Sequence, residues 1–310
     1  MDIVYKYLDI LGDNFYAEPT MKISVVRHFN DPFEGTTTHE VFEIIENLLK
    51  NVYLMQDDDF KTYNDISIKY IESKMMGNGV ISLSETSQNL LMWAHYADSH
   101  KGMCIGLSPD FAAHKNDNTT GCTFTPVSVT YGDRRLAANK SISAKRFAND
   151  LYMSHTLNKS TCWEYEKEQR IILPTHCADR ILINETDIPR KIKLIDKPEF
   201  EYSIKSWIPT ILEQKLLTFD QSGEYYCPSD DIDLSLISPY LGVFEEATFL
   251  MLVPPDKIKE IYFGCKVDDA YIDRISKMIK SDNSPLKHID LYKYKISPNN
   301  FELIPTPINR

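Results

Sequence analysis

The sequence predicts an α+β domain in which a central mixed or antiparallel sheet has helices packed against it. Short runs with strand-like alternation or continuous apolar character recur along the chain, from residues 4–7 to residues 288–296. Between them lie segments in which apolar residues recur at helical spacing. The composition, with 43% hydrophobic and 25% charged residues, is that of an ordinary globular domain. We therefore expect an ordered core built from both kinds of element.

The elements of the first 172 residues follow from these patterns and from helix-start signals such as Thr37 with Glu40, a capping box. The predicted elements, in order, are strands at 4–7 and 22–26, helices from residue 37 and at 60–76, a strand at 80–84, a helix around 90–97, strands at 103–107 and 127–131, a helix at 142–152 and a strand at 163–172.

The character of the chain changes between Pro174 and Glu246. A helix with an aromatic and aliphatic face at 200–212 precedes an acidic, turn-rich loop at 220–233. Regular structure then resumes with strands at 248–253 and 258–263, a helix at 269–279 and a strand at 288–296. We therefore expect residues 1–195 and 246–310 to form the main domain and residues 196–245 to form an inserted lobe, which is the candidate surface for a protein partner.

Charge and cysteine usage exclude several classes of protein. A net charge of −11 argues against broad nucleic-acid binding, because that binding depends on an excess of Lys and Arg. The six cysteines form no CxxC pair and no finger-like spacing, so neither a metal site nor a disulfide framework is signalled. No run of 18 apolar residues and no secretory signal pattern occurs, so we expect a cytoplasmic protein without a membrane span.

Polar side chains cluster in one turn and near the end of one helix. Asn30 and Asp31 precede Pro32 in a turn, where they either satisfy local backbone groups as an Asx turn or contact a ligand. His95 and Tyr96 lie on the flank and near the end of the helix around 90–97. For His95 we weigh a histidine bonded to a neighbouring hydroxyl against an acid–base imidazole, whose unperturbed pKa is near neutrality.

The predicted strand at 163–172 is the richest in chemistry. Strand alternation places Glu164, Glu166, Glu168 and Arg170 on one face and aromatic or aliphatic residues on the other. That charged face is either solvated or lines a cleft, where Arg170, Lys159 or Arg134 would supply the counter-charge.

Several motifs in this order resemble a bacterial family catalogued only as a domain of unknown function, number 2971. The motifs are VVRHFNDPFEG, ISLSE, LLMWAHYADSHKGMCIGL, VTYGDRR, CWEYEKEQRII and VPPDKIKEIYFGCKV. The resemblance spans most of the chain and implies a cytoplasmic bacterial protein. The segment between Pro174 and Glu246 looks longer here than in the family, so no role for it carries over.

A more distant likeness is to ADP-ribosyltransferases. Their pattern is a polar residue on an early strand, a Ser-x-Ser element on a middle strand and a Glu-x-Glu on a later one. In this chain the matching positions, in order, are Arg27 or His28, Ser82-Leu83-Ser84 and Glu166-Lys167-Glu168. The likeness implies cleavage of the nicotinamide glycosidic bond of NAD, through an oxocarbenium-like state that a fixed carboxylate stabilises.

From these patterns we expect an ADP-ribosyltransferase-like enzyme of a bacterial defence or stress-response system, with NAD as the candidate substrate. The catalytic candidates are Glu166, Glu168 and His95. The candidates for substrate binding are Asn30, Asp31, Ser82, Ser84, Tyr96 and Arg170.

Two alternatives of other classes stay open. One is a metal-dependent phosphodiesterase or nuclease with Asp31, Glu34, His95, His100 and Glu166 as ligands, which suit hard divalent cations although no pair has strong ligand spacing. The other is a non-enzymatic interaction module of a defence system that binds its partner through the lobe.

Overall fold

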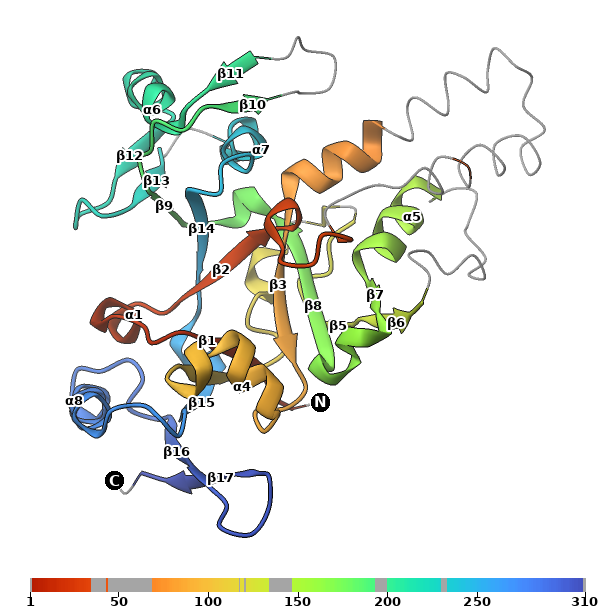
Figure 1. Ribbon diagram of the computed structural model, residues 1–310. Coiled ribbons are helices and arrows are strands. Elements are labelled where there is room, and N and C mark those ends of the chain that lie inside the picture. The colour runs from red at the N-terminus through yellow and green to blue at the C-terminus, as the bar shows by residue number, and fades with distance from the viewer. Residues whose placement is uncertain are drawn as a thin grey trace.

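The computed structural model describes residues 2–34, 43, 69–116, 118–119, 121–133, 147–192, 200–229 and 233–308. Most of these residues belong to one mixed sheet with helices around it, so the predicted α+β class is confirmed (Figure 1). The helix predicted from residue 37 and the first part of the helix predicted at 60–76 lie outside the described residues, whereas residues 69–77 are helical.

The described residues form a 13-stranded sheet, mostly antiparallel, with β15 and β16 parallel. Its strands are β1 (Val4–Leu8), β2 (Thr20–Val25), β3 (Asn78–Ser84), β4 (Met103–Leu107), β5 (Val127–Ser128), β8 (Glu168–Pro174), β9 (Arg180–Ile183), β12 (Leu217–Phe219), β13 (Tyr226–Pro228), β14 (Ala247–Leu252), β15 (Ile258–Phe263), β16 (Asp290–Ile296) and β17 (Leu303–Pro307). Two separate ribbons pair β6 (Thr130–Gly132) with β7 (Asn158–Ser160) and β10 (Arg190–Ile192) with β11 (Phe200–Tyr202).

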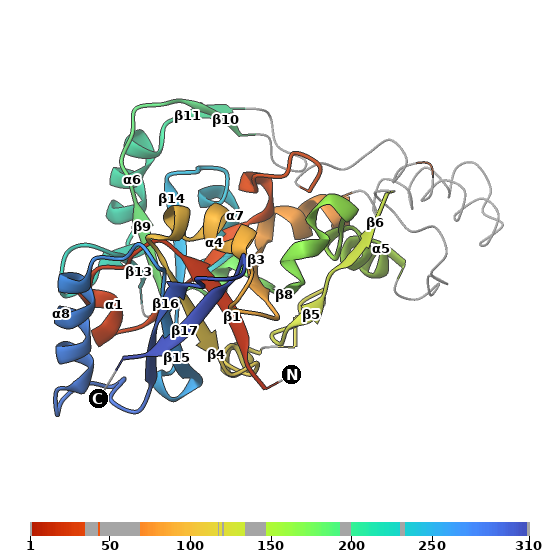
Figure 2. The same cartoon turned by 60° about the horizontal axis from the view of Figure 1, so that its bottom comes forward.

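The helices lie around this sheet. They are α1 (Asp13–Ala17), α4 (Leu90–Tyr96), α5 (Phe147–Thr156), α6 (Ile204–Glu213), α7 (Ser238–Leu241) and α8 (Asp269–Lys280). Figure 2 shows α8 near β16 at one end of the molecule, and α5 beside β6 at the other. Helix α4 begins where the side chain of Asn89 accepts hydrogen bonds from the backbone N–H groups of Leu91 and Met92, a typical N-cap.

The sheet forks at β3. One edge of β3 pairs along its whole length with β8, and the other pairs with two different strands. Near the start of β3, Val80 is opposite Ser24 of β2, and at its end Ser84 is opposite Tyr5 of β1. From there β1 leads to β4, β15, β16 and β17, while β2 leads to β14, β9, β13 and β12. Between β1 and β2, no strand among the described residues pairs with this edge of β3.

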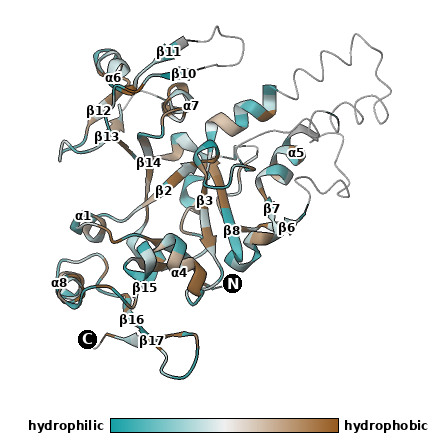
Figure 3. Ribbon diagram, in the orientation of Figure 1, coloured by the Kyte–Doolittle hydropathy of each residue, from teal (hydrophilic) through white to brown (hydrophobic). Residues whose placement is uncertain are grey.

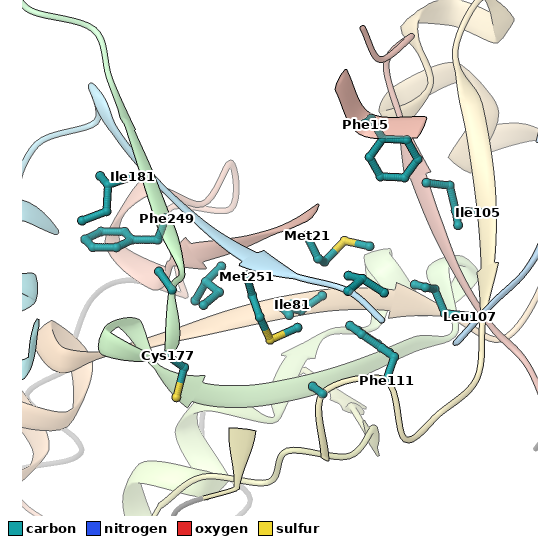
Figure 4. Close-up of a cluster of buried hydrophobic side chains, with 14 of the residues drawn as sticks. Phe15, Met21, Ile81, Ile105, Leu107, Phe111, Cys177, Ile181, Phe249 and Met251 are labelled. Carbon is teal, nitrogen blue, oxygen red and sulfur yellow. The ribbon is translucent and has the colours of Figure 1, made fainter. Parts of the chain in front are cut away.

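The core lies between the sheet and its helices. Met21, Ile81, Phe249 and Met251 are less than 3% exposed and come from three neighbouring strands, β2, β3 and β14 (Figure 4). Figure 3 shows that β3 is largely hydrophobic, whereas the adjacent β8 contains a hydrophilic stretch. Because β8 is buried along its whole length, its polar side chains must find partners inside the protein.

The strand predicted at 163–172 is a strand only in its second part. Thr161–Glu166 form a 3₁₀ helix, η5, and β8 begins at Glu168. Lys167 joins them in a left-handed conformation (φ 45°), which a continuous strand cannot contain. The prediction that Glu164 shares one strand face with Glu166 and Glu168 is therefore wrong, since Glu164 is exposed while Glu166 and Glu168 are buried.

The block predicted as an inserted lobe, residues 196–245, contributes two strands to the main sheet, because β13 pairs with β9. Ile204, Ile208 and Ile211 of α6 belong to the same cluster of buried side chains as the strands of the main domain. The boundary of the lobe stays a prediction. No helix in the described part of the chain is long and apolar enough to cross a membrane.

Candidate functional site

A cavity of about 290 Å³ lies in the fork of the sheet. Its walls include Lys6 of β1, Ser24 of β2 and Ser82 of β3, so it occupies the place where β1 and β2 separate from the edge of β3. The loop after β2 and the start of β8 complete it. A fork of this kind leaves backbone groups without strand partners, and a ligand or a side chain must satisfy them.

Six charged side chains that line this cavity are less than 10% exposed; Asp31 is one of them, and the other five form one network of ion pairs. Those five are the acids Glu34, Glu166 and Glu168 and the bases Lys159 and Arg170. The Lys159 ammonium is 2.6 Å from Glu166 Oε2, 3.1 Å from Glu168 Oε2 and 3.4 Å from Glu34 Oε1. We call these five residues the charge cluster; its formal charge is about −1 when every group is ionised.

Arg170 holds two of the three carboxylates. Its Nε and Nη2 donate to the two oxygens of Glu168 at 2.8 and 3.0 Å, and Nη2 also lies 2.8 Å from Glu34 Oε2. Its Nη1 donates to the backbone carbonyl of Thr156 at 2.5 Å. The guanidinium is therefore bonded on several sides and fixes Glu168 in one orientation.

Local backbone geometry places the two glutamates of the Glu-x-Glu motif. Glu166 is the last residue of η5, and the left-handed Lys167 turns the chain so that Glu168 begins β8. The hydroxyl of Ser84 donates to the backbone carbonyl of Glu166 at 2.7 Å, and the backbone N–H of Glu168 donates to the hydroxyl of Tyr131 at 2.7 Å. Both glutamates are thus fixed at the backbone as well as at the carboxylate.

The neighbours of Glu168 and Glu34 drive their pKa values apart. Burial acts to raise the pKa of Glu168, but Arg170, Lys159 and a hydrogen bond from Ser82 outweigh it and lower the value to about 2. For Glu34 burial prevails over Arg170 and Lys159, and its pKa lies above the usual range. Two carboxyl groups with separated pKa values in one cavity are typical of acid–base sites, although buried ion pairs also produce them.

Glu166 has a different set of partners. Its Oε1 accepts a hydrogen bond from the hydroxyl of Tyr96 at 2.6 Å, and its Oε2 accepts one from Lys159. Burial and this bond to Glu166 raise the pKa of Tyr96, so the hydroxyl stays a donor. Neither Tyr96 nor Lys159 binds the Glu166 carboxylate through two parallel hydrogen bonds, as Arg170 binds the Glu168 carboxylate.

Lys6 closes the open edge of β3. Its ammonium donates to the carbonyl oxygen of Ser82 at 2.8 Å, in the stretch where no described strand pairs with this edge of β3. Burial lowers the pKa of Lys6 to about 8, although Glu168 and Glu166 act to raise it. Within the described part of the chain, Lys6 forms no direct ion pair with a carboxylate. This lysine therefore remains able to bind an anionic group.

Aromatic rings form part of the cavity wall. The guanidinium of Arg170 lies 5.5 Å from the ring centre of Phe29, and the Lys159 ammonium lies 4.9 Å from that of Trp163. Both rings line the cavity, as do Tyr5 and Tyr7 of β1. Apolar walls with a few fixed polar groups are usual in sites for small organic ligands.

The structure brings most of the predicted site residues together. Those that line the cavity are Asn30, Asp31, Ser82, Tyr96, Glu166, Glu168 and Arg170. Asp31 also accepts a hydrogen bond from the backbone N–H of Phe33 at 2.9 Å, so its Asx-turn interpretation holds as well. The interpretation of Glu166 and Glu168 as a solvated face is wrong, since both are less than 5% exposed. Of the predicted counter-charges, Arg170 and Lys159 are present, and Arg134 lies outside the described residues.

Two predicted residues do not line the cavity. Ser84 is buried behind Glu166 and bonds its backbone. His95 is exposed, with its ring centre 6.3 Å from those of Tyr96 and Tyr165. Its contact with Tyr96, a cavity residue, places His95 on the outer side of the wall.

The structure does not bring together all the residues that were candidate metal ligands for the phosphodiesterase or nuclease alternative. Asp31, Glu34 and Glu166 line the cavity, but His95 and His100 do not. No group of three or more His, Cys, Asp or Glu in the described part of the chain is arranged to hold a metal ion. The positive charge among the three carboxylates of the cluster comes instead from Lys159 and Arg170.

Sequence reasoning missed the two lysines of the fork, Lys6 and Lys22, which line the cavity from β1 and β2. A charged residue between Tyr5 and Tyr7, in the middle of a strand, was the available signal for Lys6. No local pattern marks Lys22.

Residues 92–171 match the model of a family described as "Protein of unknown function (DUF2971)". The matched segment runs from α4 to β8 and contains Tyr96 together with four of the five residues of the charge cluster. The resemblance to that family is therefore supported over this segment. No curated protein and no solved structure is significantly similar to the chain.

Proposed function

We propose that the cavity in the fork of the sheet binds NAD and that the protein is an ADP-ribosyltransferase-like enzyme, in a bacterial defence or stress-response setting. The observation that carries the proposal is the arrangement of Ser82 of β3 and of Glu166 and Glu168, from two separate parts of the chain, around one aromatic-lined cavity. Glycosidic-bond cleavage needs a fixed carboxylate near the developing positive charge of the ribose, and this cavity supplies fixed carboxylates.

Glu166 is the better of the two catalytic candidates. Glu168 is bound by Arg170 through two bonds and also by Lys159, so its negative charge is already compensated. Glu166 is bound by Lys159 and by the neutral hydroxyl of Tyr96. We assign to Glu166 the stabilisation of the oxocarbenium-like ribose while the electron pair of the broken bond leaves with nicotinamide. Glu168 and Arg170 act as positioning residues.

Lys6 and the aromatic walls fit the rest of the substrate. NAD carries a cationic nicotinamide ring, an adenine ring, two riboses and an anionic diphosphate. Lys6 and Lys22 offer positive charge where β1 and β2 diverge, and Phe29 and Trp163 offer ring surfaces for stacking. The cavity thus contains complementary groups for the diphosphate and for the rings of this ligand.

Thermal unfolding with added ligand tests this proposal. A ligand that binds only the native state stabilises it by about 2.7 kcal/mol at a concentration 100 times its Kd. We expect NAD to raise the midpoint of wild-type protein and of Glu164→Gln, whose side chain is exposed, and manganese chloride to leave it unchanged. A shift with manganese and none with NAD would favour the metal-dependent phosphodiesterase or nuclease instead.

A partner protein bound through residues 196–245 is a second proposal. The described part of this block exposes three large apolar side chains, Tyr202, Phe219 and Leu236, of which Leu236 is 63% exposed. Exposed apolar groups of this kind occur at interaction surfaces. If the block binds a partner, cross-linking in cells should capture a complex with the wild-type protein but not with the Phe219→Ser, Leu236→Ser double variant. A complex that is captured equally with the double variant would contradict this proposal.

A further inference from the structure

A second cavity, of about 330 Å³, lies at the other end of β3 and shares no lining residue with the first. Asn78, the first residue of β3, lines it, whereas Ser82 and Leu83 line the cavity in the fork. The rest of its described wall comes from the helical residues 73–77, from Thr119, from the end of β8 and the residues that follow it (Pro174 and His176), and from the segment around α7.

The side chains around this second cavity share one feature. Its described lining includes Lys74, His176 and several hydroxyl groups, but no Asp or Glu. The chain as a whole has 45 acidic residues and a net charge of −11, whereas the described lining of this cavity contains no carboxylate; Asp233, which interacts electrostatically with His176, lies outside that lining. The local composition favours an anionic ligand and disfavours a cation.

Ser238 gives an independent indication. This residue is 0% exposed, and its hydroxyl has no hydrogen-bond partner among the described residues. An unsatisfied buried hydroxyl costs about 1–3 kcal/mol, and most such groups in native proteins have a partner. The neighbouring Ser235 lines the same cavity. A ligand oxygen would supply the partner that Ser238 lacks.

We propose that this second cavity binds the phosphate group of a small molecule. Lys74 supplies a positive charge, His176 an imidazole, and Ser235 and Ser238 hydroxyl donors, which together match the oxygens of a phosphate. The proposal does not depend on the NAD cavity or on its chemistry, because the two sites have separate walls.

Isothermal titration of the full chain with inorganic phosphate, against chloride at equal ionic strength, tests the site. We expect saturable binding whose Kd rises by at least about 10-fold in Lys74→Gln and in Ser238→Ala. The matched controls are Lys277→Gln, which removes an exposed lysine of α8, and Glu166→Gln in the first cavity. Both should bind phosphate as the wild type does.

The Ser238→Ala variant also separates a ligand role from a structural role. Because the hydroxyl has no partner among the described residues, its removal should leave the unfolding midpoint without ligand unchanged or higher, while weakening phosphate binding. Equal phosphate binding by wild type, Lys74→Gln and Ser238→Ala would overturn the proposal, as would the absence of saturable binding. A phosphate affinity that changes in Glu166→Gln but not in Lys74→Gln or Ser238→Ala would place the phosphate in the first cavity and overturn the proposal as well.

Discussion

Replacing Arg170 by Met removes the cation that holds two buried carboxylates. Arg170 is 1% exposed and pairs with Glu168 and with Glu34 at 2.8 Å. A methionine fills similar space but carries no charge, so both carboxylates would keep only Lys159 as a cationic partner. Such a change leaves charge buried without its partner, which is among the most destabilising kinds of substitution.

The size of the effect follows from the pKa of Glu168. Its ordinary value of 4.5 is lowered to about 2, mainly by Arg170 acting against burial. At about 1.36 kcal/mol for each pH unit, this corresponds to about 3 kcal/mol of stabilisation. The loss of one partner from a buried ion pair costs about 3–5 kcal/mol in other proteins. We expect Arg170→Met to lower the free energy of unfolding at pH 7 by an amount in this range.

Urea unfolding at pH 7, followed by tryptophan fluorescence, measures this difference. The matched control is Arg180→Met, because Arg180 pairs at 2.6 Å with Glu18, which is 59% exposed, and such surface pairs contribute about 1 kcal/mol or less. An Arg170→Met variant no less stable than the Arg180→Met control would refute the claim that the charge cluster holds this part of the fold together.

The remaining predictions concern pH dependence. The pKa of Glu168 is lowered to about 2 in the folded state, so the stabilisation that its carboxylate contributes is complete above pH 4.5 and is lost as the pH falls towards 2. Glu168→Gln should therefore flatten the dependence of the free energy of unfolding on pH between pH 4.5 and 2. An unchanged slope would contradict the lowered pKa of Glu168. The folded pKa of Lys6, about 8, lies below its ordinary 10.5, so its buried charge destabilises the fold fully below pH 8 and less as the pH rises to 10.5. Lys6→Met should therefore be more stable than wild type at pH 7 by about 1–2 kcal/mol, a net gain that already subtracts the lost hydrogen bond to Ser82. At pH 10.5 the variant should show no advantage. A Lys6→Met variant less stable than wild type at pH 7 would contradict this reasoning.

Strands with clear patterns were predictable, while the fork of the sheet was not. Residues 103–107 are a short apolar run and residues 258–263 are rich in isoleucine and aromatic residues, so both predict strands, and the structure has β4 and β15 there. The pairing of β3 with both β1 and β2 joins segments about 60 to 80 residues apart, and a periodic pattern does not specify which strands pair. The cavity is a consequence of that pairing.

The error at residues 163–166 has a local cause. Alternating Glu and aromatic residues fit a strand, but they also fit η5, in which Ser160 accepts a hydrogen bond from the backbone N–H of Cys162. The left-handed Lys167 was not foreseeable, since lysine seldom adopts this conformation. The motif Glu166-x-Glu168-x-Arg170 nevertheless identified three cavity residues, because their charges and spacing do not depend on which element carries them.

Release of nicotinamide from NAD tests the central proposal most directly. The wild-type protein is predicted to release nicotinamide at a rate that saturates with NAD concentration, and Glu166→Gln to be slower by about 100-fold or more, a loss of about 3 kcal/mol of transition-state stabilisation. Glu164→Gln, on the exposed side of the same 3₁₀ helix, should match the wild type. The account would be contradicted by a wild-type protein that neither binds NAD nor releases nicotinamide, or by a Glu166→Gln variant with full activity.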